Sequence, residues 1–239
     1  MAYQTTFERY EIKYLLTAQQ KQALLRAMQE HMQLDRFGRS TIRNIYYDTD
    51  TFRLIRRSLE KPTYKEKLRI RSYRQARPGD PVFVELKKKF QSVVYKRRLV
   101  LPEAQAMDSF RTGSALPVQS QIANEIEYFR AYYRTLRPAV FLSYEREAFY
   151  ALDGSDFRVT FDENILYRCR DFSLGSPVYG TSLLACGQTL MEIKTSGGMP
   201  LWMTHTLTEH GVFHTSFSKY GAAYQNMLDT DFSGGLLYA

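Results

Sequence analysis

The amino-acid sequence predicts an α+β fold in which about eight antiparallel strands close into a barrel and helices pack outside it. The first observation is a set of short segments, such as residues 67–71 and 82–89, in which apolar side chains alternate with charged ones. The second is an aromatic content of 14%, with 18 tyrosines and 15 phenylalanines, which is typical of strands. The third is that the strands form two groups of consecutive hairpins with helices between them. We expect a single domain over residues 1–239.

The first half of the chain predicts strands joined mainly as hairpins. Residues 7–16 alternate Arg9, Glu11 and Lys13 with apolar side chains, and Thr17 caps a helix expected to extend to about Leu34. A short helix or loop is expected over residues 52–59. The remaining strands are expected at residues 41–47, 68–73, 82–88 and 93–101, with turn residues at 48–50 and 77–81.

The second half opens with a polar stretch, residues 104–117, which we expect to be a loop. A helix follows, with one apolar stripe formed by Ile122, Ile126, Phe129 and Tyr133, and Pro138 ends it. Strands are expected at residues 139–150, 157–167 and 189–195. Two more helices are expected at about 200–209 and 218–227, the second capped by Ser218.

The composition favours an anionic partner. Lysine and arginine number 33 against 25 acidic residues, which gives a formal net charge of +8. Nucleic acid, phosphorylated small molecules, polyphosphate and an acidic membrane all fit this sign. Cys169 and Cys186 show no metal-binding or disulfide spacing, and no segment resembles a signal peptide or a membrane span of about 18 apolar residues. We therefore expect a cytoplasmic protein without a membrane segment in this chain.

The charged rows of the predicted strands are mostly basic. Because the opposite rows carry bulky side chains such as Leu68, Val84 and Leu190 that need burial under the helices, we expect the charged rows to face the barrel interior. Like charges about 4 Å apart repel by roughly 4 kcal/mol at an effective dielectric constant near 20, so a bound polyanion would relieve them. A solvated outer face is the alternative. The rows comprise Arg9, Lys13, Lys67, Arg69, Arg71, Lys87, Lys89, Lys96, Arg98, Arg146, Arg158 and Lys194, with the acids Glu11, Glu85 and Glu192.

The types of charge suit phosphate. The planar fork of an arginine such as Arg69 can hold two phosphate oxygens, whereas a lysine such as Lys13 is an adjustable point charge. A carboxylate beside phosphate would repel it unless a divalent cation lay between them. Glu11, Glu85 and Glu192 are therefore candidate ligands for Mg²⁺ or Mn²⁺, with internal counter-ions as the alternative.

Other chemistries lack support in the sequence. There is no phosphate-binding glycine loop, no dinucleotide-binding glycine motif and no H-E-x-x-H zinc motif. The four histidines are scattered, and we expect them to be structural or surface residues. Ser218 has no base next to it in the sequence, so we interpret it as a helix cap and not as a nucleophile.

Nine short motifs, taken in order, resemble the VTC (vacuolar transporter chaperone) domain, the polyphosphate polymerase branch of the triphosphate tunnel metalloenzymes. They extend across nearly the whole chain, so the match depends on their order more than on any one of them. The motifs are F-E-R-Y-E-I-K-Y (7–14), N-I-Y-Y-D-T (44–49), K-L-R-I-R-S-Y (67–73), V-F-V-E-L-K (82–87), Y-K-R-R (95–98), Y-E-R-E-A-F (144–149), F-R-V-T-F-D (157–162), M-E-I-K (191–194) and F-S-K-Y (217–220).

The resemblance implies an eight-stranded antiparallel tunnel that binds triphosphate or polyphosphate with Mn²⁺ or Mg²⁺. In the polymerase members, the terminal phosphate of a nucleoside triphosphate is transferred to a growing phosphate chain. The catalytic residues implied here are Lys13, Arg69, Arg71, Lys87, Arg146 and Glu192. The phosphate-binding residues implied are Lys13, Arg69, Arg71, Lys87, Lys96, Arg146, Arg158, Lys194 and Lys219. Glu192 would hold the metal, with Glu85 and Glu11 as further candidates.

Two departures bear on the expected activity. The family polymerases have a further lysine shortly before F-S-K-Y, where this chain has His214, Thr215 and Ser216. The first strand has a single E-I-K in place of the E-x-E-x-K of the cyclase and thiamine triphosphatase relatives, which argues against cyclase activity. We expect an ATP-dependent polyphosphate polymerase. The alternatives are an inorganic triphosphatase or short polyphosphate hydrolase, a non-catalytic module that binds polyphosphate or inositol phosphates, and a basic nucleic-acid binder. We expect that nucleic acid is not a partner. The sequence leaves the oligomeric state open.

Overall fold

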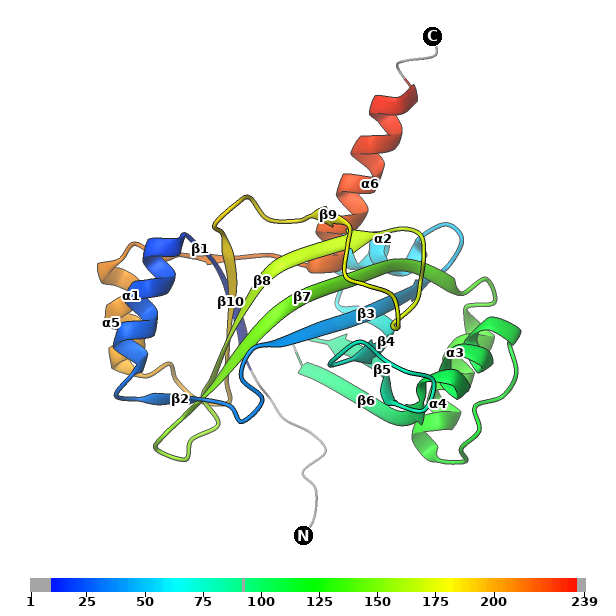
Figure 1. The fold of residues 1–239 in the computed structure, drawn as a ribbon, viewed down its shortest axis with the longest axis horizontal. Coiled ribbons are helices and arrows are strands. Elements are labelled where there is room, and N and C mark those ends of the chain that lie inside the picture. The colour runs from blue at the N-terminus through cyan, green and yellow to red at the C-terminus, as the bar shows by residue number, and fades with distance from the viewer. Residues whose placement is uncertain (1–9, 92, 236–239) are drawn as a thin grey trace. The chain divides into compact units, whose positions relative to one another are not determined.

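The computed structural model describes residues 10–91 and 93–235 of the chain, and it confirms an α+β fold built on antiparallel strands (Figure 1). The strands are β1 (Tyr10–Leu16), β2 (Met32–Leu34), β3 (Ser40–Asp48), β4 (Tyr64–Ser72), β5 (Pro81–Phe90), β6 (Val93–Pro102), β7 (Arg137–Ala151), β8 (Arg158–Arg168), β9 (Thr181–Ser182), β10 (Thr189–Thr195) and β11 (His214–Thr215). The helices are α1 (Ala18–Met28), α2 (Arg53–Leu59), α3 (Glu103–Thr112), α4 (Gln121–Tyr132), α5 (Leu201–Glu209) and α6 (Lys219–Gly235).

The described residues form two compact units. The first contains residues 10–41, 144–165 and 184–217, and the second contains residues 42–143, 166–183 and 218–235. Each unit therefore draws on segments that are far apart in the sequence. A single domain over residues 1–239 stays a prediction.

The first unit is built on the strand order β11-β1-β10-β8. Lys13 lies opposite Glu192 across β1 and β10, and Glu192 lies opposite Thr160 across β10 and β8. Because side chains alternate between the two faces of a strand, the apolar side chains of these strands form the other face. That face packs with helices α1 and α5 in a core that contains Tyr14, Leu16, Leu24, Met28, Phe157, Val159, Phe161, Met191, Ile193, Met203 and Leu207.

The second unit is built on the strand order β3-β4-β5-β6, with tight antiparallel pairing from Tyr64↔Phe90 to Arg71↔Phe83 between β4 and β5. The apolar side chains at the centre of these strands are buried, as expected from the sequence, whereas Tyr95 on β6 is 37% exposed. They pack with helices α3 and α4 in a core that contains Leu68, Ile70, Val82, Val84, Leu86, Leu99, Leu101, Ala106, Ala123, Ile126 and Phe129. The opposite, charged rows of the same strands are consequently held at fixed positions.

Closure of the barrel is not confirmed. The strands hydrogen-bond in the order β11-β1-β10-β8-β7-β3-β4-β5-β6, which has two ends within the described residues. On the side away from β10, β1 pairs with the two residues of β11. Within the described residues, β6 pairs with β5 on one side and with no strand on the other. A closed barrel would require a partner on the other side of both end strands.

Several expectations about single elements were wrong. Helix α1 ends at Met28 and not near Leu34, because Met32–Leu34 forms strand β2 against β7, and this pairing overrides local helix propensity. Residues 103–112 form helix α3 where a loop was expected; Pro102 precedes the helix, and Gly113 (φ 77°) ends it in the left-handed region. Leu190 lies opposite Asp162, on the row of Glu192 and not on the apolar row.

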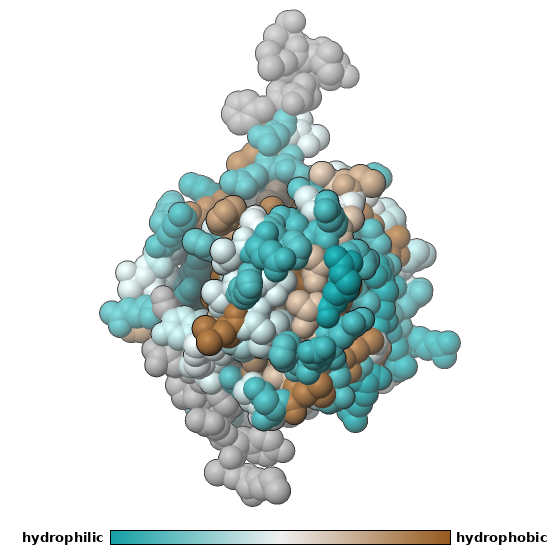
Figure 2. Space-filling model, turned by 90° about the vertical axis from the view of Figure 1, so that its left-hand side faces the viewer, coloured by the Kyte–Doolittle hydropathy of each residue, from teal (hydrophilic) through white to brown (hydrophobic). Residues whose placement is uncertain are grey.

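The side of the first unit on which α1 and α5 lie is largely hydrophilic (Figure 2). Figure 2 shows the side on which α1 and α5 lie in Figure 1, and its hydrophobic side chains form small separate groups. Tyr10 is 59% exposed although it lies on the row of β1 opposite to Glu11 and Lys13, where the alternation predicts burial, and Leu201 and Phe213 are also exposed. Single exposed apolar residues of this kind are normal on soluble surfaces. None of the helices within residues 10–91 and 93–235 is long and apolar enough to span a membrane.

Candidate functional site

One face of the second unit carries a dense group of cations. Arg69 on β4 lies opposite Glu85 on β5, and Glu85 lies opposite Arg98 on β6, so the odd rows of β4 and β5 share a face with the even row of β6. On these rows Glu85 is the one carboxylate. We call this face the second-unit cation face; its charged residues are Lys65, Lys67, Arg69, Arg71, Lys87, Lys89, Lys96, Arg98 and Glu85.

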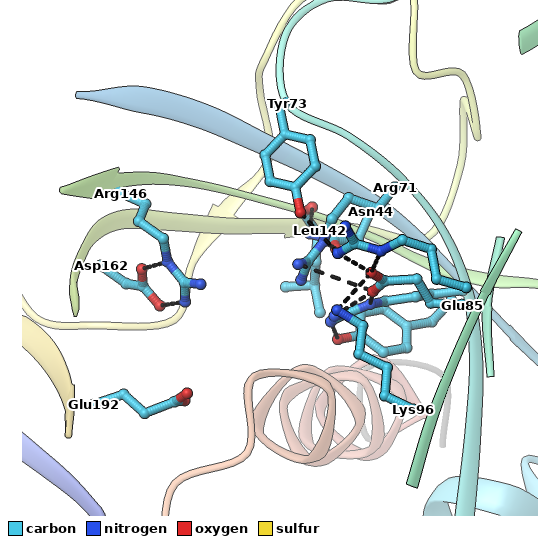
Figure 3. A network of polar contacts seen from close by, with 12 residues as sticks. Asn44, Arg71, Tyr73, Glu85, Lys96, Leu142, Arg146, Asp162 and Glu192 are labelled. Atoms are coloured by element: carbon cyan, nitrogen blue, oxygen red, sulfur yellow. Dashed lines mark hydrogen bonds and ion pairs between the residues drawn. The ribbon is translucent and has the colours of Figure 1, made fainter. Parts of the chain in front are cut away.

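Glu85 is enclosed by cations (Figure 3). Its carboxylate lies 2.7 Å from Arg69, 2.6 Å from Arg98 and 2.8 Å from Lys96, and 3.9 Å from Arg71. The carboxylate is only 1% exposed, and burial disfavours its charged form. Arg69, Arg71 and Lys96 outweigh that effect and hold the pKa of Glu85 well below its usual value. Glu85 therefore acts in this geometry as an internal counter-ion that fixes the positions of the arginines.

Two groups of this cluster, Lys96 next to Glu85 and Tyr46 next to Arg69, have their pKa lowered to about 8. Burial lowers the pKa of Lys96 to about 8, although Glu85 opposes the shift. Burial opposes ionisation of Tyr46, yet Arg69, Lys67 and Arg71 lower the pKa of Tyr46 to about 8. The Tyr46 hydroxyl accepts a 2.8 Å hydrogen bond from Arg69. The net charge of this face therefore depends on pH in the range where most proteins work.

The strand β3 supplies polar supports to the same cluster. The Asn44 side chain accepts a 2.8 Å hydrogen bond from Arg71 and donates one to the backbone oxygen of Leu142, so it orients the Arg71 guanidinium (Figure 3). Neither Asn44 nor Tyr46 was singled out from the sequence. Their place in the N-I-Y-Y-D-T motif, on alternate positions of a strand, was the signal that could have identified them.

The start of helix α6 is anchored to the same unit. The buried carboxylate of Asp48 accepts a 2.8 Å hydrogen bond from the Tyr220 hydroxyl, as well as bonds from the backbone of Leu54 and Ile55. Burial raises the pKa of Asp48, although these bonds oppose the shift. Ser218 accepts a hydrogen bond from the backbone nitrogen of Gly221, which confirms it as a helix cap. Lys67 donates a 3.1 Å bond to the Ser218 hydroxyl, and Lys219 is the first residue of the helix.

The first unit holds a second charged group. Arg146 on β7 binds Asp162 on β8 through two parallel hydrogen bonds of 2.6 Å and 2.7 Å (Figure 3). Asp162 is fully buried, and the Arg146 guanidinium lies 5.1 Å from the centre of the Tyr144 ring. Burial opposes the charge of Arg146, but Tyr144 and Asp162 raise its pKa well above the ordinary value. The arginine is thus always charged and held in one orientation.

Glu192 on strand β10 lies between two lysines, Lys194 on the same strand and Lys13 on β1. Its carboxylate is 2.7 Å from Lys194 and 3.9 Å from Lys13, and Lys13 also donates a 2.7 Å hydrogen bond to the backbone oxygen of Phe217. Across the sheet, Glu192 faces Thr160. The Thr160 hydroxyl oxygen is buried and has no hydrogen-bond partner in the described part of the chain. A buried polar atom of this kind is costly unless a ligand completes its hydrogen bonding.

The residues near Glu192 fit a divalent cation bound jointly with phosphate. Within residues 10–91 and 93–235, no group of three or more His, Cys, Asp or Glu side chains could form a metal cage. Mg²⁺ commonly binds through one or two carboxylates together with substrate phosphates and water. Glu192 and the unpartnered hydroxyl of Thr160 supply oxygen ligands of that kind. Glu11 lies on the same row, opposite Lys194, whereas Glu85 is already surrounded by cations.

The expected site residues fall into two groups, one in each unit. The first unit holds Glu11, Lys13, Arg146, Arg158, Glu192 and Lys194, and the second holds Arg69, Arg71, Glu85, Lys87, Lys96 and Lys219. Within the first unit, Arg158 lies opposite Lys194. Arg9 lies outside the described residues. Asp162, Thr160, Asn44 and Tyr46 are the polar partners that the sequence reasoning missed.

Comparison of the chain with models of known protein families identifies its family. The model of the VTC domain matches residues 8–228. The chain belongs to the VTC domain family. This confirms the resemblance inferred from the nine motifs. No curated protein matches the VTC domain described here at the level required for a significant relationship.

Solved structures resemble the fold of this VTC domain at low sequence identity. A putative adenylate cyclase from Bacillus halodurans has a TM-score of 0.54 and 14% identity, over 90% of this chain and 95% of its own. A putative adenylyl cyclase from Hippeastrum, described as having a dominant triphosphatase activity, has a TM-score of 0.57 and 16% identity, over 90% and 95%. A putative adenylate cyclase from Vibrio parahaemolyticus has a TM-score of 0.50 and 12% identity, over 92% and 99%. Likeness at this identity concerns the fold.

Proposed function

We propose that this VTC domain is a metal-dependent phosphotransferase that binds ATP and polyphosphate and transfers the terminal phosphate of ATP to a growing polyphosphate chain. The observation that carries the proposal is the second-unit cation face, where eight lysines and arginines share one carboxylate. Such an excess of like charge on one sheet face is destabilising without an anion. Membership of the VTC domain family supports polyphosphate as that anion.

The arginines would bind and orient phosphate. Arg69 and Arg71 are held by Glu85 and Asn44, and Arg146 is held by Asp162, so their guanidinium groups are preorganised. Preorganised cations stabilise charge that develops on transferring phosphoryl oxygens without moving during the reaction. Lysines such as Lys87 and Lys194 would add charge without demanding one geometry.

The proposed reaction needs little covalent chemistry from the protein. A terminal oxygen of the phosphate chain forms a bond to the γ-phosphorus of ATP, the bond from that phosphorus to the β,γ-bridging oxygen breaks, and ADP leaves. Mn²⁺ or Mg²⁺, when bound, would neutralise charge on the phosphate oxygens. Glu192, with the Thr160 hydroxyl beside it, would hold the ion, and Lys194 and Lys13 position the Glu192 carboxylate.

The proposal is tested with the purified chain, ATP and either Mn²⁺ or Mg²⁺, followed by gel detection of polyphosphate. We expect long polymer with the unchanged protein, and its loss in Arg69→Ala and Glu192→Gln. Lys88→Gln is a matched control, because Lys88 lies on the same strand as Lys87 but on the opposite row, near Glu125. Thermal unfolding of each variant separates loss of activity from loss of fold.

Three results would replace the proposal. Binding of ATP without any lengthening of phosphate, with both metals, would rule out a polymerase and leave a binding module. Release of orthophosphate from inorganic triphosphate without chain growth would identify a hydrolase, in which water takes the place of the phosphate acceptor. Competition by single-stranded oligonucleotide as strong as that by triphosphate would favour a nucleic-acid binder.

A further inference from the structure

Two lysines at one end of the second-unit cation face, Lys65 and Lys89, add to its charge but have no individual role in the site described above. Lys65 on β4 lies directly opposite Lys89 on β5, and the next pair on the same face of the sheet is Lys67 opposite Lys87. Residues directly opposite each other in an antiparallel sheet have Cβ atoms about 4.5–5.5 Å apart, and like charges at that separation destabilise the sheet. Two consecutive pairs of this kind indicate a ligand of opposite charge.

The surroundings of the Lys65–Lys89 pair do not neutralise it. In the part of the chain that the structure describes, neither amine forms a side-chain hydrogen bond or ion pair. Burial lowers the pKa of Lys65, and the charges of Lys89, Lys87 and Lys61 lower it further. On the third strand of this face, the residue opposite Lys89 is Val94. The pair therefore differs from the Arg69 position, where Glu85 balances the charge.

The position of the pair relates it to the length of a bound chain. A strand rises about 3.3 Å per residue, so Lys65 lies about 13 Å from Arg69 and about 20 Å from Arg71 along β4. The cations from Arg71 to Lys65 thus extend farther than a triphosphate group. A ligand that reached both ends would be a phosphate chain longer than triphosphate.

We propose that the Lys65–Lys89 pair is a separate binding subsite for the distal part of a long polyphosphate chain, so that it sets chain-length preference without contributing to triphosphate binding. The inference rests on the proposed polyphosphate chemistry of this face. Lysine suits such a role, because a flexible point charge binds successive phosphates without fixing their register. The rows at this end present Lys65, Lys89 and Val94, with no aromatic ring for base stacking, which favours polyphosphate over single-stranded nucleic acid.

The test compares binding of inorganic tripolyphosphate and of a long-chain polyphosphate to the full chain, measured in chelator without ATP. In Lys65→Gln/Lys89→Gln we expect the affinity for the long chain to fall at least about tenfold. We expect the affinity for tripolyphosphate to change by less than about twofold. The slope of log affinity against log salt should decrease by about 1.4 for the long chain, at about 0.7 for each cation removed from a single-stranded polyanion site.

The control is Lys88→Gln/Arg97→Gln, which removes the same charge from the opposite rows of β5 and β6, where both side chains contact Glu125. We expect no selective loss of long-chain binding in this variant. Because the Lys65–Lys89 change removes a repulsion, its melting temperature should not fall. If it does fall, the single variants Lys65→Gln and Lys89→Gln are compared in the same assay.

Three results would overturn the proposal. Equal loss for tripolyphosphate and long chain would place the pair in the triphosphate site, and no loss for either would remove it from binding. If an oligonucleotide of the same charge displaced long-chain polyphosphate as well as polyphosphate itself does, the subsite would not be specific for polyphosphate. Because binding is measured without ATP or metal, a chain that makes no polymer still tests the subsite, so failure of the proposed function is recognised separately. If the function holds, the double variant should also make shorter polymer.

Discussion

The substitution Glu85→Gln separates two roles of that residue, counter-ion and metal ligand. Glu85 is 1% exposed and lies within 2.8 Å of Arg69, Lys96 and Arg98. Removing one partner of a buried ion pair commonly costs 3–5 kcal/mol, because the other charges stay buried without compensation. The side chains of Lys96 and Arg98 are 40% and 35% exposed and can regain water. We therefore expect a loss of about 3 kcal/mol in the free energy of unfolding.

Thermal and urea unfolding at pH 7 measure this loss. For a chain of this size, about 3 kcal/mol corresponds to a decrease of about 6–12 °C in melting temperature. Glu125→Gln is the matched control, since Glu125 contacts Lys88 and Arg97 on the opposite rows of β5 and β6, at partly exposed positions. We expect this variant to lose less than about 1 kcal/mol of unfolding free energy. Tripolyphosphate should raise the melting temperature of Glu85→Gln more than that of the unchanged protein, because an anion replaces the missing charge.

The pH dependence gives a second reading of the same variant. The folded-state pKa of Glu85 is lowered, so its contribution to stability is complete above the unfolded value near 4.5 and is lost as the pH falls below it. Glu85→Gln should therefore lose less stability than the unchanged protein on acidification. A loss under about 1 kcal/mol at pH 7, combined with weaker metal dependence, would refute the counter-ion interpretation and favour a metal ligand.

Three further predictions concern the other charged groups. As the pH rises through about 8, Lys96 loses its positive charge and Tyr46 gains a negative one, so the affinity for tripolyphosphate should fall several-fold. Titration calorimetry should show a smaller fall in Lys96→Arg/Tyr46→Phe. The same pH profile in this variant and in the unchanged protein would contradict this prediction. Asp162→Asn leaves Arg146 without its buried partner and should cost about 3–5 kcal/mol of unfolding free energy in urea; a neutral effect would show that Arg146 is held by other contacts. Thr160→Val removes a buried hydroxyl without a described partner, so the melting temperature should stay equal or rise while Mn²⁺-dependent phosphate binding weakens; a lower melting temperature with normal binding would assign the hydroxyl a structural role.

Much of the cation face was predictable from the sequence. The alternation in residues 67–71 and 82–89 has the period of a strand, and a strand allows one arrangement of successive side chains relative to the sheet. The apolar side chains of these segments are fully buried as expected, which assigns Arg69, Lys87 and their neighbours to the opposite face. The cationic residue types of this face were therefore recognisable before any contact was known.

The partners of these residues were not predictable in the same way. Glu85 was a metal candidate from the sequence, and only the register between β4, β5 and β6 shows three cations against its carboxylate. The Lys65–Lys89 opposition and the Thr160–Glu192 opposition also depend on register. Register between strands is set by turns and packing over the whole sheet, so local periodicity does not contain it.

The secondary structure was likewise predicted where the local pattern sets it and missed where contacts between distant segments set it. Strand β10 was placed correctly because Met191 and Ile193 alternate with Glu192 and Lys194, whereas β2 was expected to be helix because its strand geometry comes from pairing with β7. Helix α3 was expected to be a loop because its sequence is mostly polar, but Ala106, Met107 and Phe110 recur at helical spacing and pack against the core of the second unit.

By itself, the sequence determined the VTC family, the strand faces and the basic character of the site, because composition and alternation are local properties of the chain. Tertiary structure decided which charges meet. It placed Glu85 among arginines, set Asp162 against Arg146 and left Lys65 opposite Lys89, because these distances depend on how strands far apart in the sequence align. The energies of buried charges follow from such distances and from exclusion of water, and both exist only in the folded chain.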